Sequence, residues 1–426
     1  MGLILPDEPR YADVGRAMAQ SGDWITPRLW GHPWFEKPAL LYWMIGAGFK
    51  LGLGPELAPR LPVALLGLGF LGFFWFRLRH LWDPTVASYS TALLATSAGW
   101  MAYSHVAITD IPMAAFFSAA LLLALDARTG GNAVLIAALL GLATLAKSLP
   151  PLVLFLPVLA LDYRHLRQWL LPWPILTFAI VTLPWHILCT MQNGSEFLRV
   201  LFIEHQLGRF TSGALQHGQP WWFYLPVLLL LLYPWFPLML AIPSDLRDRR
   251  IRTLLSVVLF GFVFLSAGVN KLPSYLLPLI PAICVLIGVG LARRSRPQNL
   301  IAASIAILAL LPIAAGVLPG ALATGIRSTP LPWTPLAIWL TLGILTGTAL
   351  MFAMKKNHLF AAVALTGICF LWFQTAVFPP IDRAASARTL WNSQHPVCAP
   401  NLRRTVLYSL YYYSGRELPP CDILDQ

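Results

Sequence analysis

The sequence predicts an all-α membrane protein, a helix bundle that crosses the bilayer many times. Of its 426 residues, 57% are hydrophobic and only 11% are charged, whereas soluble domains carry about 25% charged residues. The apolar residues gather into runs of roughly span length, and the basic residues form short clusters between these runs. The formal charge of +12 is therefore a topology signal, and it does not indicate nucleic-acid binding.

About twelve segments are predicted to span, although some fall short of the roughly 20 residues that a span needs. They are Pro59–Phe76, Pro84–Val106, Ile111–Leu125, Ala133–Ala146, Pro150–Leu161, Trp169–Met191, Trp222–Ile242, Leu254–Ala267, Pro273–Leu291, Leu300–Leu318, Pro332–Met354 and Leu359–Phe378. With the loop of Arg77 and Arg79 placed inside, the short inside loops are strongly basic, as the positive-inside rule requires. The chain then divides into an outward first loop (1–58), a transmembrane bundle (59–378) with a large outer loop (192–221), and a small outward C-terminal domain (379–426).

One further apolar stretch, Pro38–Leu53, is predicted not to span. Counting it would flip every later loop and break the charge rule, so we expect a helix lying in the outer interface. Both ends of the chain then face outward, and no cleavable signal peptide is visible at the start. We expect one more N-terminal span in the natural chain; a genuine outside N-terminus is the alternative.

The five cysteines fall into two groups. Cys189, Cys284 and Cys369 lie in apolar segments and are predicted to be small core residues. Cys398 and Cys421 lie in the polar tail, where they would pair if the tail faces an oxidising compartment. Two free thiols are an equally open alternative.

Polar residues of the first outward loop are candidates for chemistry. Asp7, Glu8 and Arg10 open a helix-like run, where the two acids could equally be helix caps. Glu36 and Lys37 stand beside several aromatic residues where the chain enters the interface. A lysine there can neutralise a lipid phosphate as a point charge, and ordinary headgroup anchoring is the alternative.

Ionisable residues of three further segments also point to function. Asp110 is the only acid between two long apolar runs, where an ionisable residue is costly and indicates a functional site. Its alternative role is the N-cap of the next helix. Lys271 and Tyr275 supply a cation and a phenol at the outer rim, and Lys147 supplies a further cation between two spans.

Six segments carry a resemblance to a known family. In chain order they read DEPRYADVGRAM, GDWITPRL, WFEKPALLYW, ITDIPM, HGQPWWFYLP and KLPSYLLP. With them the chain resembles the polyprenyl-phosphate-dependent glycosyltransferases of the GT-C class, most of all the lipid A aminoarabinose transferase branch. The protein O-mannosyltransferases are more distant. The resemblance implies an outward first loop with two interface helices, a spanning helix before Asp7, and an outward C-terminal domain. The tail here is much shorter than in the aminoarabinose transferases.

The resemblance also implies roles for individual residues. The acids expected at the reacting sugar are Asp7, Asp110 and Glu8. The groups expected to hold the donor phosphate are Lys37, Arg10, Lys271 and Tyr275. The residues expected to bind a divalent metal such as Zn, Mg or Mn are Glu36 and His217, with His205 as the fallback. Imidazole and carboxylate suit such ions, but spacing alone does not support the pair.

The expected activity is inverting transfer of 4-amino-4-deoxy-L-arabinose, or a related sugar, from undecaprenyl phosphate to lipid A or another envelope acceptor. The enzyme would lie in the inner membrane among its lipids, with its site on the periplasmic face. No P-loop or Rossmann fingerprint appears, so we expect no nucleotide cofactor. The alternatives are a lipid-linked sugar transporter or flippase, a protein O-mannosyltransferase-like enzyme, and a lipid-binding scaffold.

Overall fold

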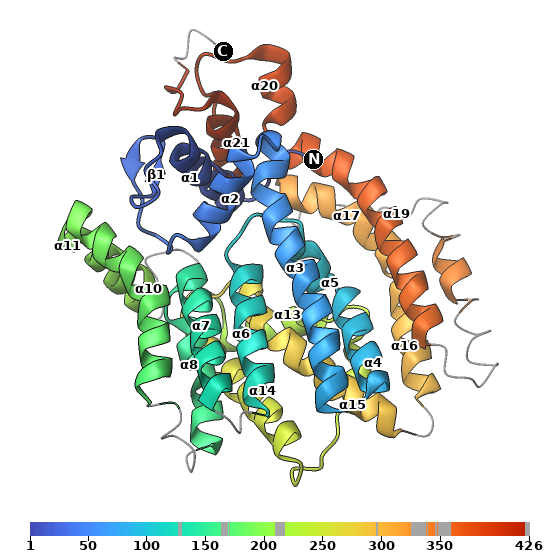
Figure 1. Cartoon of the computed structure of the whole chain (residues 1–426). Helices are drawn as coiled ribbons and strands as arrows, with labels where there is room; N and C mark the ends of the chain where they lie inside the picture. Colours follow the sequence, from blue (N-terminus) through green and yellow to red (C-terminus); the bar gives the residue numbers. More distant parts are fainter. Residues whose placement is uncertain are drawn as a thin grey trace.

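The structure, a computed structural model, describes residues 1–126, 130–162, 169, 171–208, 218–294, 297–324, 338, 340–345, 347 and 359–421. It is a helix bundle with a smaller helical layer at one end (Figure 1). The bundle contains α3 (Gly54–Leu81), α4 (Pro84–Ala95), α5 (Ala98–Ser104), α6 (Asp110–Ala124), α7 (Gly130–Lys147), α8 (Pro150–Leu161), α10 (Pro172–Asn193), α13 (Tyr224–Leu231), α14 (Arg249–Ala267), α15 (Ile280–Arg293), α16 (Gln298–Leu308), α17 (Leu311–Thr324) and α19 (Leu359–Ala385).

The layer at one end joins the two ends of the chain, α1 and α2 with α20 and α21 (Figure 1). Its elements are α1 (Asp7–Ser21), the hairpin strands β1 (Arg28–Leu29) and β2 (His32–Pro33), α2 (Leu40–Lys50), α20 (Arg388–Gln394) and α21 (Arg404–Ser414). The remaining short elements are α11 (Ser195–Leu198), η2 (Arg199–Leu207), η3 (Trp221–Phe223), η4 (Phe236–Ala241) and η5 (Pro273–Leu279).

The helices confirm a polytopic membrane fold. Within the described ranges, five helices are long and apolar enough to cross a membrane, or six if α16 and α17, bent by 42°, form one span. Every predicted segment except Pro332–Met354, most of which lies outside the described residues, is occupied by helical structure. α2 has 11 residues, too short to cross a hydrocarbon core of about 30 Å, as predicted for Pro38–Leu53.

Three of the predicted spans are broken, Pro84–Val106, Trp222–Ile242 and Leu300–Leu318, the last between α16 and α17, which corrects the expectation of continuous helices. The first two breaks provide hydrogen-bond partners for each other. The backbone N–H of Ala98 donates to the Tyr233 carbonyl at 2.9 Å. The indole Nε1–H of Trp235 donates to Thr96 Oγ1 at 3.0 Å. Broken helices persist in a membrane only where neighbours satisfy the released backbone groups in this way.

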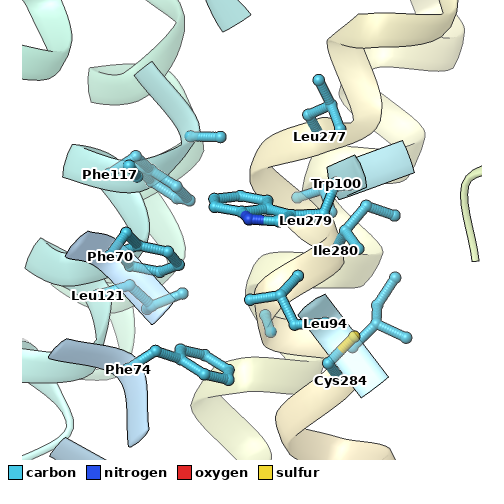
Figure 2. Packing of buried hydrophobic residues seen from close by; sticks show 14 of the residues in the cluster. Phe70, Phe74, Leu94, Trp100, Phe117, Leu121, Leu277, Leu279, Ile280 and Cys284 are labelled. Carbon is cyan, nitrogen blue, oxygen red and sulfur yellow. The ribbon is translucent and has the colours of Figure 1, made fainter. Parts of the chain in front are cut away.

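The main core lies where α3, α5, α6 and α15 meet. Figure 2 shows Trp100 reaching between the side chains of Phe70 and Phe117 on one side and those of Leu279 and Ile280 on the other. The ring centres of Phe70 and Trp100 are 5.2 Å apart. Of the apolar cysteines, Cys189 and Cys284 are buried, as predicted, and Cys369 is partly buried.

The C-terminal tail is tied to the start of the chain. Gly2 donates its backbone N–H to Asp382 at 2.6 Å, and the Ser409 hydroxyl donates to the Leu3 carbonyl at 3.1 Å. A disulfide joins Cys398 and Cys421, which confirms the pairing alternative. The predicted domain boundary at residue 378 falls inside α19, which continues to Ala385.

Gly290 provides a test of this packing. A Cβ atom added at Gly290 in α15 would lie 1.8 Å from the Ala241 carbonyl oxygen, whereas one added at Gly72 in α3 would meet nothing within 4 Å. Overpacking of this kind costs about 1–3 kcal/mol. We expect Gly290→Ala to lower the thermal unfolding midpoint in detergent by several degrees. The control, Gly72→Ala, should leave the midpoint unchanged or raise it, because alanine favours helix; equal midpoints would contradict the packing described.

Candidate active site

An apolar cavity of about 250 Å³ opens between the first loop and the helices α8 and α14. Its walls come from hydrophobic residues of α8 and α14, and several polar side chains stand around it. The lining residues are Lys37, Met113, Lys147, Leu149, Pro150, Val153, Leu154, His205, Gln206, Phe264, Leu265, Gly268, Asn270 and Tyr275. The structure thus brings Lys37 and Tyr275, which the sequence predicted to act together, into one site with Lys147.

Both lysines of this cavity are buried and both have a carboxylate partner. Lys37 Nζ lies 3.0 Å from Glu36 Oε1, and Lys147 forms an ion pair with Asp110. Burial of an ammonium group costs several kcal/mol unless it is paired, so each acid makes its lysine tolerable at this place. The cavity therefore combines apolar walls with two buried cations, each paired with a carboxylate.

Local helix geometry creates the Lys147–Asp110 pair. Asp110 is the first residue of α6 and Lys147 the last residue of α7, and these two helices pack together. The acid at a helix start and the cation at a helix end each also favour the helix dipole. The N-cap position of α6 is occupied by Thr109, so Asp110 is not the N-cap of this helix. The Tyr275 ring centre lies 4.5 Å from Lys147 Nζ.

A second charged group continues from Glu36 into α1. Arg10 Nη1 donates to Glu36 Oε2 at 3.3 Å, and Arg10 also forms an ion pair with Asp7. Burial opposes the charge of Arg10, but Glu36 and Asp7 outweigh that effect and the net pKa of Arg10 is raised. Asp7, with 35% of its side chain exposed, is the accessible end of this group. Asp7 is the first residue of α1, and Pro6 occupies the N-cap position.

Glu8 has a different position from the other predicted acids. Its carboxylate is fully buried and accepts two hydrogen bonds from Arg60, each at 2.7 Å. It also accepts the backbone N–H groups of Ile4 at 2.9 Å and Ala107 at 3.1 Å. With four donors around it, Glu8 anchors the start of α1 to α3 and to the loop before Asp110, so we do not retain it as a reacting acid.

Lys271 also has a structural environment. Its ammonium group donates to the carbonyl oxygens of Gln219 at 2.9 Å and Gly268 at 2.5 Å. Its neighbour Asn270 lines the cavity, whereas Lys271 joins its own loop to the loop of Gln219. Lys147 lines the cavity and Lys271 does not, so we assign the phosphate contact that was predicted for Lys271 to Lys147. No such role was predicted for Lys147 from the sequence alone.

A more polar cavity of about 370 Å³ adjoins the first through His205, which lines both. Its lining residues are Pro33, Trp34, Phe35, Glu36, Asn193, Glu196, Val200 and His205. His205 lies in η2, a π-helical segment, and such segments are rare and often found at functional sites. His217 lies outside the described residues, so His205 is the histidine that the structure places at Glu36.

The described residues do not fit a metal centre. They contain no group of three or more His, Cys, Asp and Glu side chains that could hold an ion. The Glu36 carboxylate already accepts from Arg10, Lys37 and the Tyr11 hydroxyl. Arg10 and Lys37 already place two positive charges beside this carboxylate, and these charges would repel a metal cation. We therefore assign no step of the reaction to a metal.

The sequence is similar to those of known glycosyltransferases. The profile of the family described as dolichyl-phosphate-mannose-protein mannosyltransferase matches residues 36–187. The undecaprenyl phosphate-alpha-4-amino-4-deoxy-L-arabinose arabinosyl transferase of Pseudomonas aeruginosa (strain LESB58) is 34% identical over 331 residues, covering 71% of this chain and 58% of that protein. The similarly named transferase 2 of Pseudomonas fluorescens (strain Pf0-1) is 32% identical, covering 70% of this chain and 57% of that protein. The chain thus spans less than two thirds of the length of these relatives.

The fold is shared with a solved structure along nearly the whole chain. The crystal structure of ArnT from Cupriavidus metallidurans bound to undecaprenyl phosphate superposes with a TM-score of 0.79 at 26% identity, covering 98% of this chain and 81% of that chain. Through these relatives and this shared fold, the chain belongs to the GT-C superfamily of polyprenyl-phosphate-dependent glycosyltransferases, in the branch of the aminoarabinose transferases.

Proposed function

We propose that this protein is an inverting glycosyltransferase of the inner membrane. It moves 4-amino-4-deoxy-L-arabinose, or a related sugar, from undecaprenyl phosphate to a phosphate group of lipid A on the periplasmic face. The names of the curated relatives support the donor, and the ligand of the similar crystal structure supports its lipid phosphate.

One observation supports this function above all others: the apolar cavity that has two buried lysines at its polar side. A polyprenyl phosphate has a matching division into an apolar chain and an anionic head. Val153 and Phe264 provide apolar wall for the first part of the chain, and Lys37 and Lys147 provide charge for the phosphate. Lysine binds phosphate as a point charge.

The same lysines suit the chemistry of transfer. The acceptor oxygen attacks the anomeric carbon in line as the bond from that carbon to the phosphate oxygen breaks, and the electron pair stays on the phosphate. The leaving lipid phosphate thereby gains one negative charge. Lys37 and Lys147 lie where this charge develops, and cations held there in advance lower the barrier.

The second cavity suits the sugar and the acceptor. It shares Glu36 with the charged group of α1 and carries the aromatic side chains of Trp34 and Phe35, which can pack on a sugar ring. A phosphate acceptor is already anionic and needs no base. Asp7 then positions Arg10 and the incoming groups, and Asp110 serves as the counterion of Lys147.

The direct test is transfer in detergent solution. Purified protein, undecaprenyl phosphate-linked aminoarabinose and lipid A are mixed, and modified lipid A is measured by mass spectrometry. A flippase would give no product, because it makes no bond. Absence of product, with the donor intact, would contradict the proposed function; transfer to a peptide hydroxyl in place of lipid A would support the protein O-mannosyltransferase-like alternative.

Lys37 provides a test of the donor site. Lys37→Met keeps the length of the side chain and removes its charge, and hydrogen bonds to charged groups are worth about 1.5–3 kcal/mol. We expect the Kd for undecaprenyl phosphate in nanodiscs to rise by about tenfold or more. Lys50→Met is the matched control, since Lys50 is exposed at the end of α2. Equal affinity in the two variants would contradict the assignment of Lys37.

Asp7 provides a test of the acceptor. Loss of a general base typically lowers a rate by about 10²–10⁴. Since a phosphate acceptor requires no base, we expect Asp7→Asn to lower kcat by less than about a hundredfold with lipid A. A larger loss, with the same KM for the donor, would contradict a phosphate acceptor and indicate that a hydroxyl group is deprotonated by Asp7.

A further inference from the structure

The first helix contains one short pattern twice. Asp7 is followed three residues later by Arg10, and Asp13 three residues later by Arg16, and both pairs form ion pairs. The two arginines thus have their charges oriented by carboxylates of their own helix. Repetition of this pattern points to a second surface that the arginines contact together.

That surface is a pair of tyrosines on α21, in the C-terminal tail. The guanidinium carbon of Arg10 lies 5.4 Å from the ring centre of Tyr408, and that of Arg16 lies 4.4 Å from the ring centre of Tyr412. Arg10 also lies 5.3 Å from the ring centre of Trp34, so Tyr408 and Trp34 hold it together. The Tyr408 ring in turn has Arg404 at 5.2 Å. Tyr408 and Tyr412 are four residues apart and therefore share one helix face. Figure 1 shows α21 directly beside α1.

Only the Arg10 contact continues to the cavity. Arg10 is 6% exposed and shares the Glu36 carboxylate with Lys37. If Arg10 moved away, Glu36 would lose one of the cations beside it and would attract Lys37 more strongly. The Lys37 charge would then be compensated more fully and would attract a phosphate less.

We propose that Tyr408 is a positioning residue of the donor site: its ring holds Arg10 on Glu36 and thereby leaves the charge of Lys37 available to the lipid phosphate. The proposal rests on the proposed function, because that function supplies the reaction. Among the described residues, none of the C-terminal tail lines either cavity, so the tail would act on the site from a distance. The Tyr408 hydroxyl accepts a hydrogen bond from Arg404. The proposed role therefore belongs to the ring of Tyr408 and not to its hydroxyl group.

Three variants separate the ring from the hydroxyl and from general tail packing. Arg10 is buried and Tyr408 is half-buried. A cation–π contact in such a place is worth about a factor of five in an equilibrium, so Tyr408→Leu should lower kcat/KM for transfer about fivefold. Tyr408→Phe keeps the ring and should retain activity within about twofold. Tyr411→Leu is the matched control, because Tyr411 packs on Trp30, with ring centres 5.1 Å apart. Equal losses in Tyr408→Leu and Tyr411→Leu would overturn the proposal.

A double-mutant cycle tests the route through Lys37. Tyr408→Leu should weaken undecaprenyl phosphate binding in the wild-type background and have little further effect when Lys37 is replaced by Met, since residues in one network are not additive. A purely structural role of Tyr408 would give the same loss in both backgrounds, and that result would overturn the proposal.

The accessibility of Arg10 to a chemical reagent tests the positioning role of Tyr408 even if no sugar is transferred. Phenylglyoxal reacts with arginine, and peptide mass spectrometry gives the rate at Arg10. Removal of the ring should uncover Arg10, so its modification should be faster in Tyr408→Leu than in Tyr408→Phe or Tyr411→Leu. Equal rates in the three variants would overturn the positioning role. Unequal rates in a protein without transfer would contradict the proposed function alone.

Discussion

The structure depends on one electrostatic constraint: two lysine side chains are buried at the head of an apolar cavity, and each needs a carboxylate to remain there. A single unpaired ammonium group in such surroundings costs several kcal/mol. The two pairs are built differently. Lys147 meets Asp110 across the packed helices α6 and α7, whereas Lys37 meets its neighbour Glu36 in the first loop.

The helical layer at one end of the bundle holds these pairs in place. Arg10 links Glu36 to Asp7 in α1. Glu8 joins the start of α1 to Arg60 in α3 and to the backbone of Ala107, three residues before Asp110. The first loop and the α6–α7 pair are therefore connected by buried polar contacts, which fix the two lysines relative to each other at the cavity.

Apolar segments and loop charges were sufficient to predict the fold class and most helix positions, because lipid requires long apolar helices. The breaks at Thr96 and Tyr233 were not predictable, since each depends on a partner more than a hundred residues away. Lys37, Tyr275 and Asp110 were found from local signals, namely charge or phenol at the edge of an apolar run. The pairing that makes Lys147 important, and the anchoring of Glu8 by Arg60, are long-range contacts that no local pattern reveals. The metal pair of Glu36 and His217 remains a prediction that the described residues do not support.

The disulfide of the tail has a consequence for the distant cavity. Cys398 and Cys421 enclose α21, and a crosslink over a loop of this length stabilises the folded tail by about 3 kcal/mol. Since α21 carries Tyr408, a reductant added during purification would loosen a helix that touches Arg10, although neither Cys398 nor Cys421 lines the cavity. Preparations that differ only in thiol reagent would then differ in their affinity for a lipid phosphate.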